Sequence, residues 1–474
     1  MLRARQLYRA SKRQAQALLR PLVAAWDPDP SAFAPERWHL EHEPGHGLRL
    51  HGLRLHELLE RFGSPLFVVD AKMLRSNAAA FQAVPAGASG GCEVFYSYKT
   101  NPIEAVLREL HAAGVGAEVI SPYELWLALR LGVPPERILY NGPGKSDESI
   151  RTAIEANILA INCNHREELE RVARIAKSLG RVARIGIRVN TEDSWTQQFG
   201  TPIRGGQALA AFQEALARPE LELVALHAHR GGMIRSESEL LSFVDQVLSF
   251  VGVLADAGVR LPMLDFGGSL GLATVAPLNA RDRKLNQFLQ RPMPLPELAG
   301  TLTIERYVRL VVERVEEVYR KRADPQPRIL LEPGRAMTGN TQFLLASVLT
   351  IKEAEALRFA VLDAGINLAE SVRNEHHQLF SVNRYGEPAS RVHSVVGPIC
   401  SPADTLYSAV LLPELRAGDS LAIMDAGAYF VPFSTSFSYP RPAIVQVDAG
   451  TATLIRERET FEDLTRHDRA ANGL

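Results

Sequence analysis

The feature that most constrains the fold of this sequence is a repeated alternation of short apolar runs and longer helical patterns between Pro65 and Arg335. The runs are rich in β-branched and aromatic residues, which favour strands. They are Leu66–Asp70, Glu93–Lys99, Ala117–Ser121, Ile138–Gly142, Leu159–Cys163, Val182–Asn190, Leu221–His229, Met263–Gly268 and Arg328–Glu332. Strands that alternate with helices this often indicate parallel pairing. If the first run belongs to a neighbouring domain, eight strand–helix units remain in about 250 residues, the size of a TIM (β/α)8 barrel.

The pattern changes after Met337. Extended stretches separated by turns, with little helical periodicity, predict an all-β domain. They are Phe343–Ile351, Arg358–Leu362, Ser420–Met424 and Ala443–Val447. We therefore predict four parts, namely a basic N-terminal arm (1–34), a segment that joins the β domain (35–64), the barrel (65–336) and the C-terminal β domain (337–474). The stretch Ala273–Leu302 is predicted to be an insertion after the seventh barrel strand.

The N-terminal arm carries six basic residues and no acidic residue before Asp27. Its leucines follow a weak helical spacing that Pro21 interrupts. We favour an arm that packs on the body of the protein or on a partner subunit, because a targeting segment would need a longer apolar core and a cleavage site. The segment 27–30, Asp-Pro-Asp-Pro, is predicted to be a linker.

The overall composition excludes several classes of protein. Lysine and arginine number 53 and aspartate and glutamate 54, so the net charge of -1 argues against a globally basic nucleic-acid binder. The three cysteines, Cys92, Cys163 and Cys400, lack the spacing of a disulfide framework or a zinc site. A reducing, cytoplasmic location is therefore expected. No uninterrupted apolar run reaches about 18 residues, so no membrane span is expected.

Polar residues and glycines recur where the predicted barrel strands end. They are Lys99, Ser121, Asn141 with Gly142, Asn162, Arg188 with Asn190, His229, Gly267 with Gly268, and Glu332. The active sites of such barrels are built at the carboxyl ends of the strands. The recurrence therefore predicts an active site at this end of the barrel.

Two of these residue types have more than one interpretation. A lysine after an apolar strand is desolvated, which lowers its pKa and allows a neutral amine to form a Schiff base. Lys99 could also be an ordinary surface lysine.

His227 and His229 face the same side of a strand. They could form a metal pair, but no acidic or histidine partner with suitable spacing stands nearby in the sequence. We favour His229 stacking on a ring, with a buried core histidine as the alternative.

The glycine turns 265–271 and 332–335 lie at the ends of the last two barrel strands, where barrels commonly bind phosphate. Glu332 ends an apolar strand, and a buried carboxylate needs a partner such as a protonated pyridine nitrogen. A reactive lysine, a phosphate cradle, a stacking imidazole and this carboxylate are together the requirements of pyridoxal phosphate. No metal is predicted.

The sequence resembles the fold-type III pyridoxal-phosphate decarboxylases, the family of diaminopimelate and ornithine decarboxylases. The resemblance covers residues from about Pro65 to Val447, and the matching motifs occur in the family's order. They are Tyr96–Asn101, Gly116–Ser121 with Glu124, Asn141–Pro143 with Lys145, His227–Gly231, Asp265–Gly271, Glu332–Arg335, Gly397–Asp404, and Asp425–Tyr429 leading to Phe437. The resemblance implies that the β domain is a Greek-key barrel completed by N-terminal residues.

The resemblance also implies roles for individual residues. Lys99 would form the Schiff base, His229 would stack on the ring and Glu332 would pair with the pyridine nitrogen. The cofactor would also contact a further group, namely Glu118, Ser121, Gly231, Gly268, Ser269, Gly334, Arg335 and Tyr429. In this family the active site lies at a homodimer interface, so Cys400 would come from the neighbouring subunit and protonate the carbanion. The substrate would contact Arg335, Asn367, Arg373, Cys400, Ser401, Asp404 and Phe437.

Departures from the family pattern affect the expected substrate. An acidic residue usually follows the active-site cysteine and binds the distal amine of the substrate, whereas this chain has Ser401. The stretch Asp363–Arg373 lacks the Arg-Pro pair of the diaminopimelate enzymes, Gly232 stands where serine is common and Ser269 replaces a glycine. We therefore expect an amino acid whose distal group is capped, amidated or carrier-linked. The alternatives are free diaminopimelate, ornithine or lysine, with Glu370 as a candidate amine partner.

Two other activities fit the same cofactor. A racemase would need two opposed acid–base groups, usually the lysine and a tyrosine. A non-catalytic homologue would not need Lys99, His229, Glu332 and Cys400 together. The cysteine segment with Asp404 favours decarboxylation over both.

Overall fold

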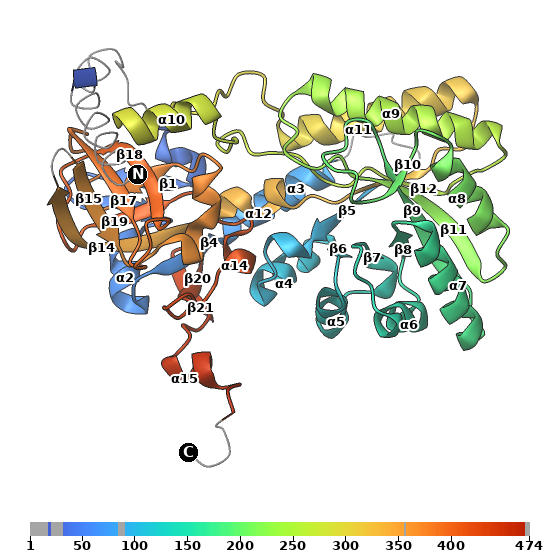
Figure 1. The fold of residues 1–474 in the computed structure, drawn as a ribbon, viewed down its shortest axis with the longest axis horizontal. Helices are drawn as coiled ribbons and strands as arrows, with labels where there is room; N and C mark the ends of the chain where they lie inside the picture. The colour runs from blue at the N-terminus through green and yellow to red at the C-terminus, as the bar shows by residue number, and fades with distance from the viewer. Residues whose placement is uncertain (1–17, 20–31, 84–90, 355–356, 470–474) are drawn as a thin grey trace, which may run out of the picture. The chain divides into compact units, whose positions relative to one another are not determined.

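The structure is a computed structural model that describes residues 18–19, 32–83, 91–354 and 357–469. Most of the predicted N-terminal arm and the predicted linker at 27–30 lie outside these residues. The chain divides into two compact units (Figure 1). The barrel unit comprises Leu74–Ala273 and Leu298–Gly339, and the β unit comprises Met1–Met73, Thr274–Glu297 and Asn340–Leu474.

Eight parallel strands close the barrel unit. In sheet order they are β9 (Ala183–Asn190), β11 (Leu221–Ala228), β12 (Met263–Asp265), β13 (Arg328–Leu331), β5 (Cys92–Ser97), β6 (Gly116–Val119), β7 (Ile138–Tyr140) and β8 (Ala160–Cys163), and β8 pairs with β9 to close the ring. The short strand β10 (Thr201–Pro202) pairs with β9 outside the ring. The predicted TIM barrel is therefore confirmed.

Apolar side chains from several barrel strands pack together. Phe95, Leu139, Leu159, Val224 and Leu330 belong to one buried apolar cluster. Parallel strands with both faces covered read as nearly continuous apolar runs, which is why the sequence pattern located them.

Amphipathic helices alternate with the barrel strands (Figure 1). They are α3 (Ala71–Gln82, which begins in the β unit), α4 (Glu104–Ala112), α5 (Pro122–Arg130), α6 (Asp147–Ala156), α7 (Arg166–Leu179), α8 (Gln207–Leu216), α9 (Glu237–Asp256), α11 (Ile304–Arg322) and the single-turn α12 (Arg335–Thr338). Side-chain caps define several starts, because a hydroxyl oxygen can accept an unpaired N–H of the first turn. Ser121 accepts the N–H of Glu124 at α5, and Ser236 with Glu239 forms a capping box at α9.

Among the described helices, α9 is long and apolar enough to cross a membrane by length and composition alone. It packs against α11, and Leu240, Phe243 and Val247 on its inner face are buried. A buried core helix passes the same test, and α9 is such a helix of the barrel.

The β unit is built on a twisted sheet with the strand order β18-β17-β15-β14-β4-β20-β21, to which β19 and β16 add through β14. The strands are β4 (Leu66–Asp70), β14 (Gln342–Ala354), β15 (Leu357–Leu362), β16 (Leu379–Ser381), β17 (Arg391–Val396), β18 (Thr405–Leu412), β19 (Ser420–Ile423), β20 (Ala443–Asp448) and β21 (Thr451–Arg456). A three-stranded sheet of β1 (Leu40–Glu43), β2 (Gly47–Leu50) and β3 (Leu53–Arg54) belongs to the same unit.

Short helices complete the β unit. They are η1 (Pro35–Trp38), α2 (Leu55–Phe62), α10 (Ala280–Leu289), α13 (Ile366–Ala369), η5 (Glu370–Arg373), α14 (Phe430–Phe433) and α15 (Phe461–Thr465). The segment 35–64, which was predicted to join the β domain, lies in this unit.

The unit boundaries differ from the predicted domain boundaries at two places. The strand β4 falls within the predicted barrel range 65–336, but it hydrogen-bonds between β14 and β20 in the β unit, as the count of eight barrel strands required. The middle of the predicted barrel insertion also belongs to the β unit. Its Asn286 side chain donates to the carbonyl of Ala409 in β18, at 2.9 Å. Both differences arise because long-range pairing decides which unit a segment joins.

Candidate active site

The carboxyl ends of the barrel strands bring the predicted site residues together within the barrel unit. Lys99 lies in the 3-10 turn η2 (Tyr98–Thr100) that follows β5, and Glu118 lies in β6. His227 lies in β11 and His229 directly follows it, while Glu332 directly follows β13. Because parallel strands end at one face, residues more than 200 positions apart in sequence share one site.

A buried amide connects two carboxylates at the centre of this site. The side chain of Asn141 donates to Glu332 Oε1 at 2.6 Å and to Glu118 Oε1 at 2.9 Å. Its own oxygen accepts the side-chain amide of Asn162 at 2.7 Å. Glu118 also accepts the hydroxyl of Ser97. Asn141 therefore fixes the spacing of two acidic groups that would otherwise repel each other.

Two neighbours, His227 and Asp265, lower the pKa of Glu332. Burial alone would raise its pKa, but the nearby His227 and a hydrogen bond with Asp265 lower it overall. His227 Nε2 lies 3.2 Å from Glu332 Oε2. Asp265 shows the opposite shift, since burial and the charge of Glu332 raise its pKa well above the usual range. These shifts favour the neutral form of Asp265 and the charged form of Glu332.

His229 is held as a neutral ring. Burial, followed by the positive charge of Lys99, lowers its pKa well below the usual range. The N–H of Gly268 donates to His229 Nδ1 at 3.2 Å, and Ser269 Oγ lies 3.3 Å from His229 Nε2. The ring plane is thereby fixed by hydrogen bonds at both nitrogens, as a stacking role requires.

The two glycine turns lie against each other at the ends of β12 and β13. The N–H of Glu332 donates to the carbonyl of Gly267 at 2.7 Å. A side-chain carbon on Gly268 would overlap the carbonyl of Glu332, and one on Gly334 would overlap the hydroxyl of Thr100. Only glycine fits these close approaches. The N–H of Gly231 reaches the same region through Ser269 Oγ, at 2.9 Å.

For three other residues of the predicted site in the barrel unit, the structure shows local contacts or burial only. Ser121 uses its hydroxyl to cap α5, and Glu124 accepts the N–H of Ile120 at 2.8 Å. Arg335 is half-buried at the first position of α12. Direct contact of Ser121 and Arg335 with a cofactor stays a prediction.

The remaining predicted site residues lie in the β unit. Cys400 and Phe437 are exposed, Arg373 is exposed at the end of η5, and Tyr429 stacks on Phe433 with ring centroids 5.9 Å apart. Asn367 is buried and accepts the N–H of Gly365. The roles predicted for these residues toward cofactor or substrate stay predictions.

Asp404 positions the segment that carries Cys400 and Ser401. Its carboxylate is almost fully buried and accepts the N–H groups of Ile366 and Ile399, both at 2.7 Å. A side-chain carbon on Gly365 or Gly397 would overlap the same carboxylate. Asp404 therefore fixes the loop one residue before the cysteine, and its predicted contact with substrate stays a prediction.

Sequence reasoning gave no role to several residues that the structure places in the site. Asn141, His227 and Asp265 contact Glu332, and Arg188 is near enough for its pKa to respond to Glu332 and Glu118. No acidic partner of the paired histidines stands nearby in the sequence, but the fold brings Glu332 to them from about 100 residues away. Asn141, Arg188, His227 and Asp265 all lie at or near the ends of barrel strands, and this shared position was the signal for them in the sequence.

The family comparison supports this chemistry. A family model described as "Pyridoxal-dependent decarboxylase, pyridoxal binding domain" matches residues 72–339, more than half of the chain. The chain belongs to the family of pyridoxal-dependent decarboxylases. The predicted family and the prediction of a pyridoxal-dependent amino-acid decarboxylase are thereby confirmed.

Individual relatives agree with the family assignment. The diaminopimelate decarboxylases of Aquifex aeolicus and Methanothermobacter thermautotrophicus are each 32% identical, covering 90% of this chain and 96% of theirs. A solved structure of diaminopimelate decarboxylase from M. jannaschii in complex with L-lysine has a TM-score of 0.82 at 27% identity, covering 91% of this chain and 98% of that one.

The decarboxylase therefore uses pyridoxal 5′-phosphate, and the described site fits this cofactor. Lys99 would supply the amine, the carboxylate of Glu332 would pair with a protonated ring nitrogen, and the two tight glycine turns leave room for a close approach of the phosphate. When bound, the cofactor supplies an aldehyde and an electron-withdrawing ring. His229 would orient that ring, and the lowered pKa of Glu332, to which His227 contributes most, would favour the charged carboxylate beside the ring nitrogen.

We expect the side-chain amide of Asn141 to be as important for turnover as a residue that contacts the cofactor directly. Asn141→Asp removes both N–H donors and adds a third carboxyl between Glu118 and Glu332, which raises the pKa values of all three. We expect kcat/KM to fall about 10- to 100-fold and the acid limb of the pH profile to move to higher pH. The measurement is the pH dependence of carbon dioxide release. Asn157→Asp, at the exposed C-cap of α6, is the matched control; an unshifted profile in Asn141→Asp would refute the positioning role.

Proposed function

We propose that this decarboxylase removes carbon dioxide from diaminopimelate. The observation that carries the proposal is the similarity to enzymes of that name over nearly their whole length, at up to 32% identity. The complex of the M. jannaschii relative with L-lysine supports the same substrate class, because lysine is diaminopimelate without one carboxylate. The sequence-based expectation of a modified amino acid gains no support from these relatives.

We further propose that the enzyme is a homodimer with shared active sites. In this arrangement Lys99, His229 and Glu332 of one subunit work with the cysteine segment of the other. Cys400 is exposed in its own unit, on a loop that Asp404 holds in place, so its thiol is available to donate a proton to the carbon that loses the carboxylate.

A second candidate substrate is an amino acid whose distal end is capped or extended. Two observations favour it. Ser401 cannot pair with a distal ammonium as a carboxylate would. The loop that follows it, at Pro402, Ala403 and Thr405, lines a cavity of about 690 Å³ within the β unit.

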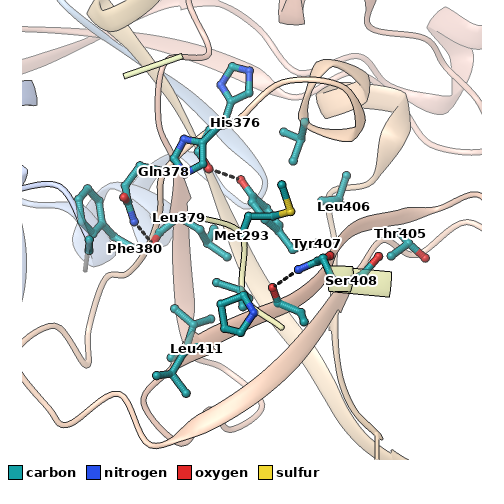
Figure 2. A pocket seen from close by; sticks show the side chains of 18 of the residues that line it. Met293, His376, Gln378, Leu379, Phe380, Thr405, Leu406, Tyr407, Ser408 and Leu411 are labelled. Atoms are coloured by element: carbon teal, nitrogen blue, oxygen red, sulfur yellow. Dashed lines mark hydrogen bonds between the residues drawn. The ribbon is translucent and has the colours of Figure 1, made fainter. Parts of the chain in front are cut away.

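Residues of α10, β16 and β18 line the cavity, and Figure 2 shows part of its lining. Met293, Leu406 and Leu411 give it an apolar lining, and His376 and Gln378 add polar groups. Tyr407 donates its hydroxyl to the carbonyl of His377 at 3.0 Å, which holds one wall in place. A cavity of this size and mixed lining is large enough for the distal part of a substrate.

Measuring carbon dioxide release from matched pairs of substrates distinguishes the two proposed substrate classes. Each pair holds a free diamino acid (diaminopimelate, ornithine or lysine) and its counterpart with a capped distal amine. The main proposal predicts the highest kcat/KM with free diaminopimelate. The second predicts release from capped members only, with Ser401→Asp raising turnover of the free partner and Ser401→Ala as the control. Preference for free ornithine or lysine would contradict both.

A further inference from the structure

A second cluster of metal-ligating side chains lies in the β unit, outside the decarboxylase site. His39 Nδ1 is 2.7 Å from Asp70 Oδ2, and His51 Nε2 is 2.9 Å from Asp70 Oδ1. The two imidazole rings are tilted with centroids 5.6 Å apart. One ligand atom from each of the three residues lies within 4.8 Å of the others. We call these three residues the His39 cluster.

The cluster joins three elements that are separate in the sequence. His39 ends η1, His51 lies in the turn between β2 and β3, and Asp70 ends β4. Asp70 Oδ1 also accepts the N–H groups of Lys72 and Met73 at the start of α3, which fixes the orientation of the carboxylate. The anionic ligand is therefore preorganised by backbone contacts that do not depend on the histidines.

Both histidines have a positive φ, which is uncommon for residues other than glycine. The φ of His39 is 54° and that of His51 is 47°, in the left-handed region. His51 precedes Gly52 in a two-residue hairpin turn, where Asn or Asp before Gly is the usual choice. Non-glycine residues in this region cost about 1 kcal/mol, and such positions gather at functional sites. The side chains are thus placed at a conformational cost.

The composition and exposure of the cluster suit a divalent transition metal. Two imidazoles and one carboxylate are a common ligand set for zinc, with the fourth position left to water. The side chains of His39 and His51 are 30% and 15% exposed, whereas that of Asp70 is 3% exposed, so the site is open on the imidazole side. Ligand atoms around a tetrahedral zinc are about 3.3 Å apart, which requires each imidazole to withdraw by roughly 0.5 Å.

We propose that the His39 cluster binds one zinc ion per chain and ties η1 and the β2–β3 turn to the end of β4. An ion bound by three elements stabilises the folded state in which they meet. The site is separate from the decarboxylation chemistry, since none of its three residues is among the residues predicted to contact the cofactor or the substrate. The zinc proposal can therefore be tested without knowing the substrate.

The test uses the full-length, tag-free enzyme loaded with its cofactor and stripped of metal with EDTA. Zinc chloride is titrated by calorimetry, and native mass spectrometry gives the stoichiometry. We expect one ion per chain, an increase in Tm on binding, and a loss of affinity of at least about 100-fold in His39→Gln/His51→Gln. His46→Gln, an exposed histidine in the turn between β1 and β2, is the matched control and should bind like the parent. Unchanged affinity in the double variant would overturn the proposal, as would no binding by the parent.

A second measurement covers the case in which the double variant fails to fold. X-ray absorption at the zinc edge of the parent, loaded with one equivalent, should show two imidazole nitrogens and only nitrogen and oxygen ligands. A sulfur ligand would place the ion at a cysteine such as the exposed Cys400, and would overturn the proposal.

Discussion

Mixing two inactive variants, Lys99→Ala and Cys400→Ala, is expected to restore about a quarter of the parent activity. Lys99→Ala alone should lose the visible absorbance of the bound cofactor and at least about 1,000-fold in kcat, because no other group replaces its amine. Cys400→Ala should keep that absorbance and lose turnover. If each site takes Lys99 from one subunit and Cys400 from the other, a mixed dimer has one intact site and one doubly defective site.

The expected recovery follows from counting. Random exchange of subunits makes half of the dimers mixed, and half of the sites in a mixed dimer are intact. A site built within one chain would give no intact site in any dimer. The measurement is carbon dioxide release after subunit exchange, with native mass spectrometry to verify that mixed dimers form. Each variant exchanged with itself is the control. Mixed dimers without activity would contradict the shared site.

The second large effect is expected from Glu332→Gln, which should lower kcat about 100- to 1,000-fold. Glutamine has nearly the same shape but cannot carry the negative charge that a protonated ring nitrogen needs. In the native site, His227 and Asp265 keep the pKa of Glu332 below its usual range even though burial opposes ionisation. The variant removes the charge that this arrangement maintains.

The matched control for this substitution is Glu124→Gln. Glu124 is also buried in the barrel unit, but burial raises its pKa to about 7 and its carboxylate accepts a backbone N–H that glutamine can accept too. We expect less than about a threefold change in kcat for Glu124→Gln. The measurements are kcat and the cofactor absorbance spectrum as a function of pH. Similar losses in both variants would show that any buried carboxylate matters, and would refute the specific role of Glu332.

The barrel was predictable because its strands are buried on both faces and leave continuous apolar runs in the sequence. The positions of Lys99, His229 and Glu332 followed from the same pattern, since each comes at the end of a run. The arrangement around them was not predictable. Asp265 controls the charge of Glu332 only because β12 and β13 are neighbours in the ring, and the sequence pattern does not show how close their side chains come.

The boundaries between the two units also depend on long-range contacts that the sequence pattern does not show. The run Leu66–Asp70 has the composition of a barrel strand, yet its partners β14 and β20 are about 275 and 375 residues further along the chain. Local composition predicts that a strand forms, and long-range pairing decides where it goes. The His39 cluster was missed for this reason, because two histidines in separate turns have no spacing pattern that points to Asp70.

The central claim is that this chain is a pyridoxal-phosphate decarboxylase acting on diaminopimelate from the barrel site around Lys99. Its most direct test is the release of labelled carbon dioxide from carboxyl-labelled meso-diaminopimelate by the cofactor-loaded enzyme, with lysine quantified in the same reaction. We predict equal amounts of carbon dioxide and lysine from the parent and neither from Lys99→Ala. Consumption of the substrate without carbon dioxide, or equal release by Lys99→Ala, would contradict the account.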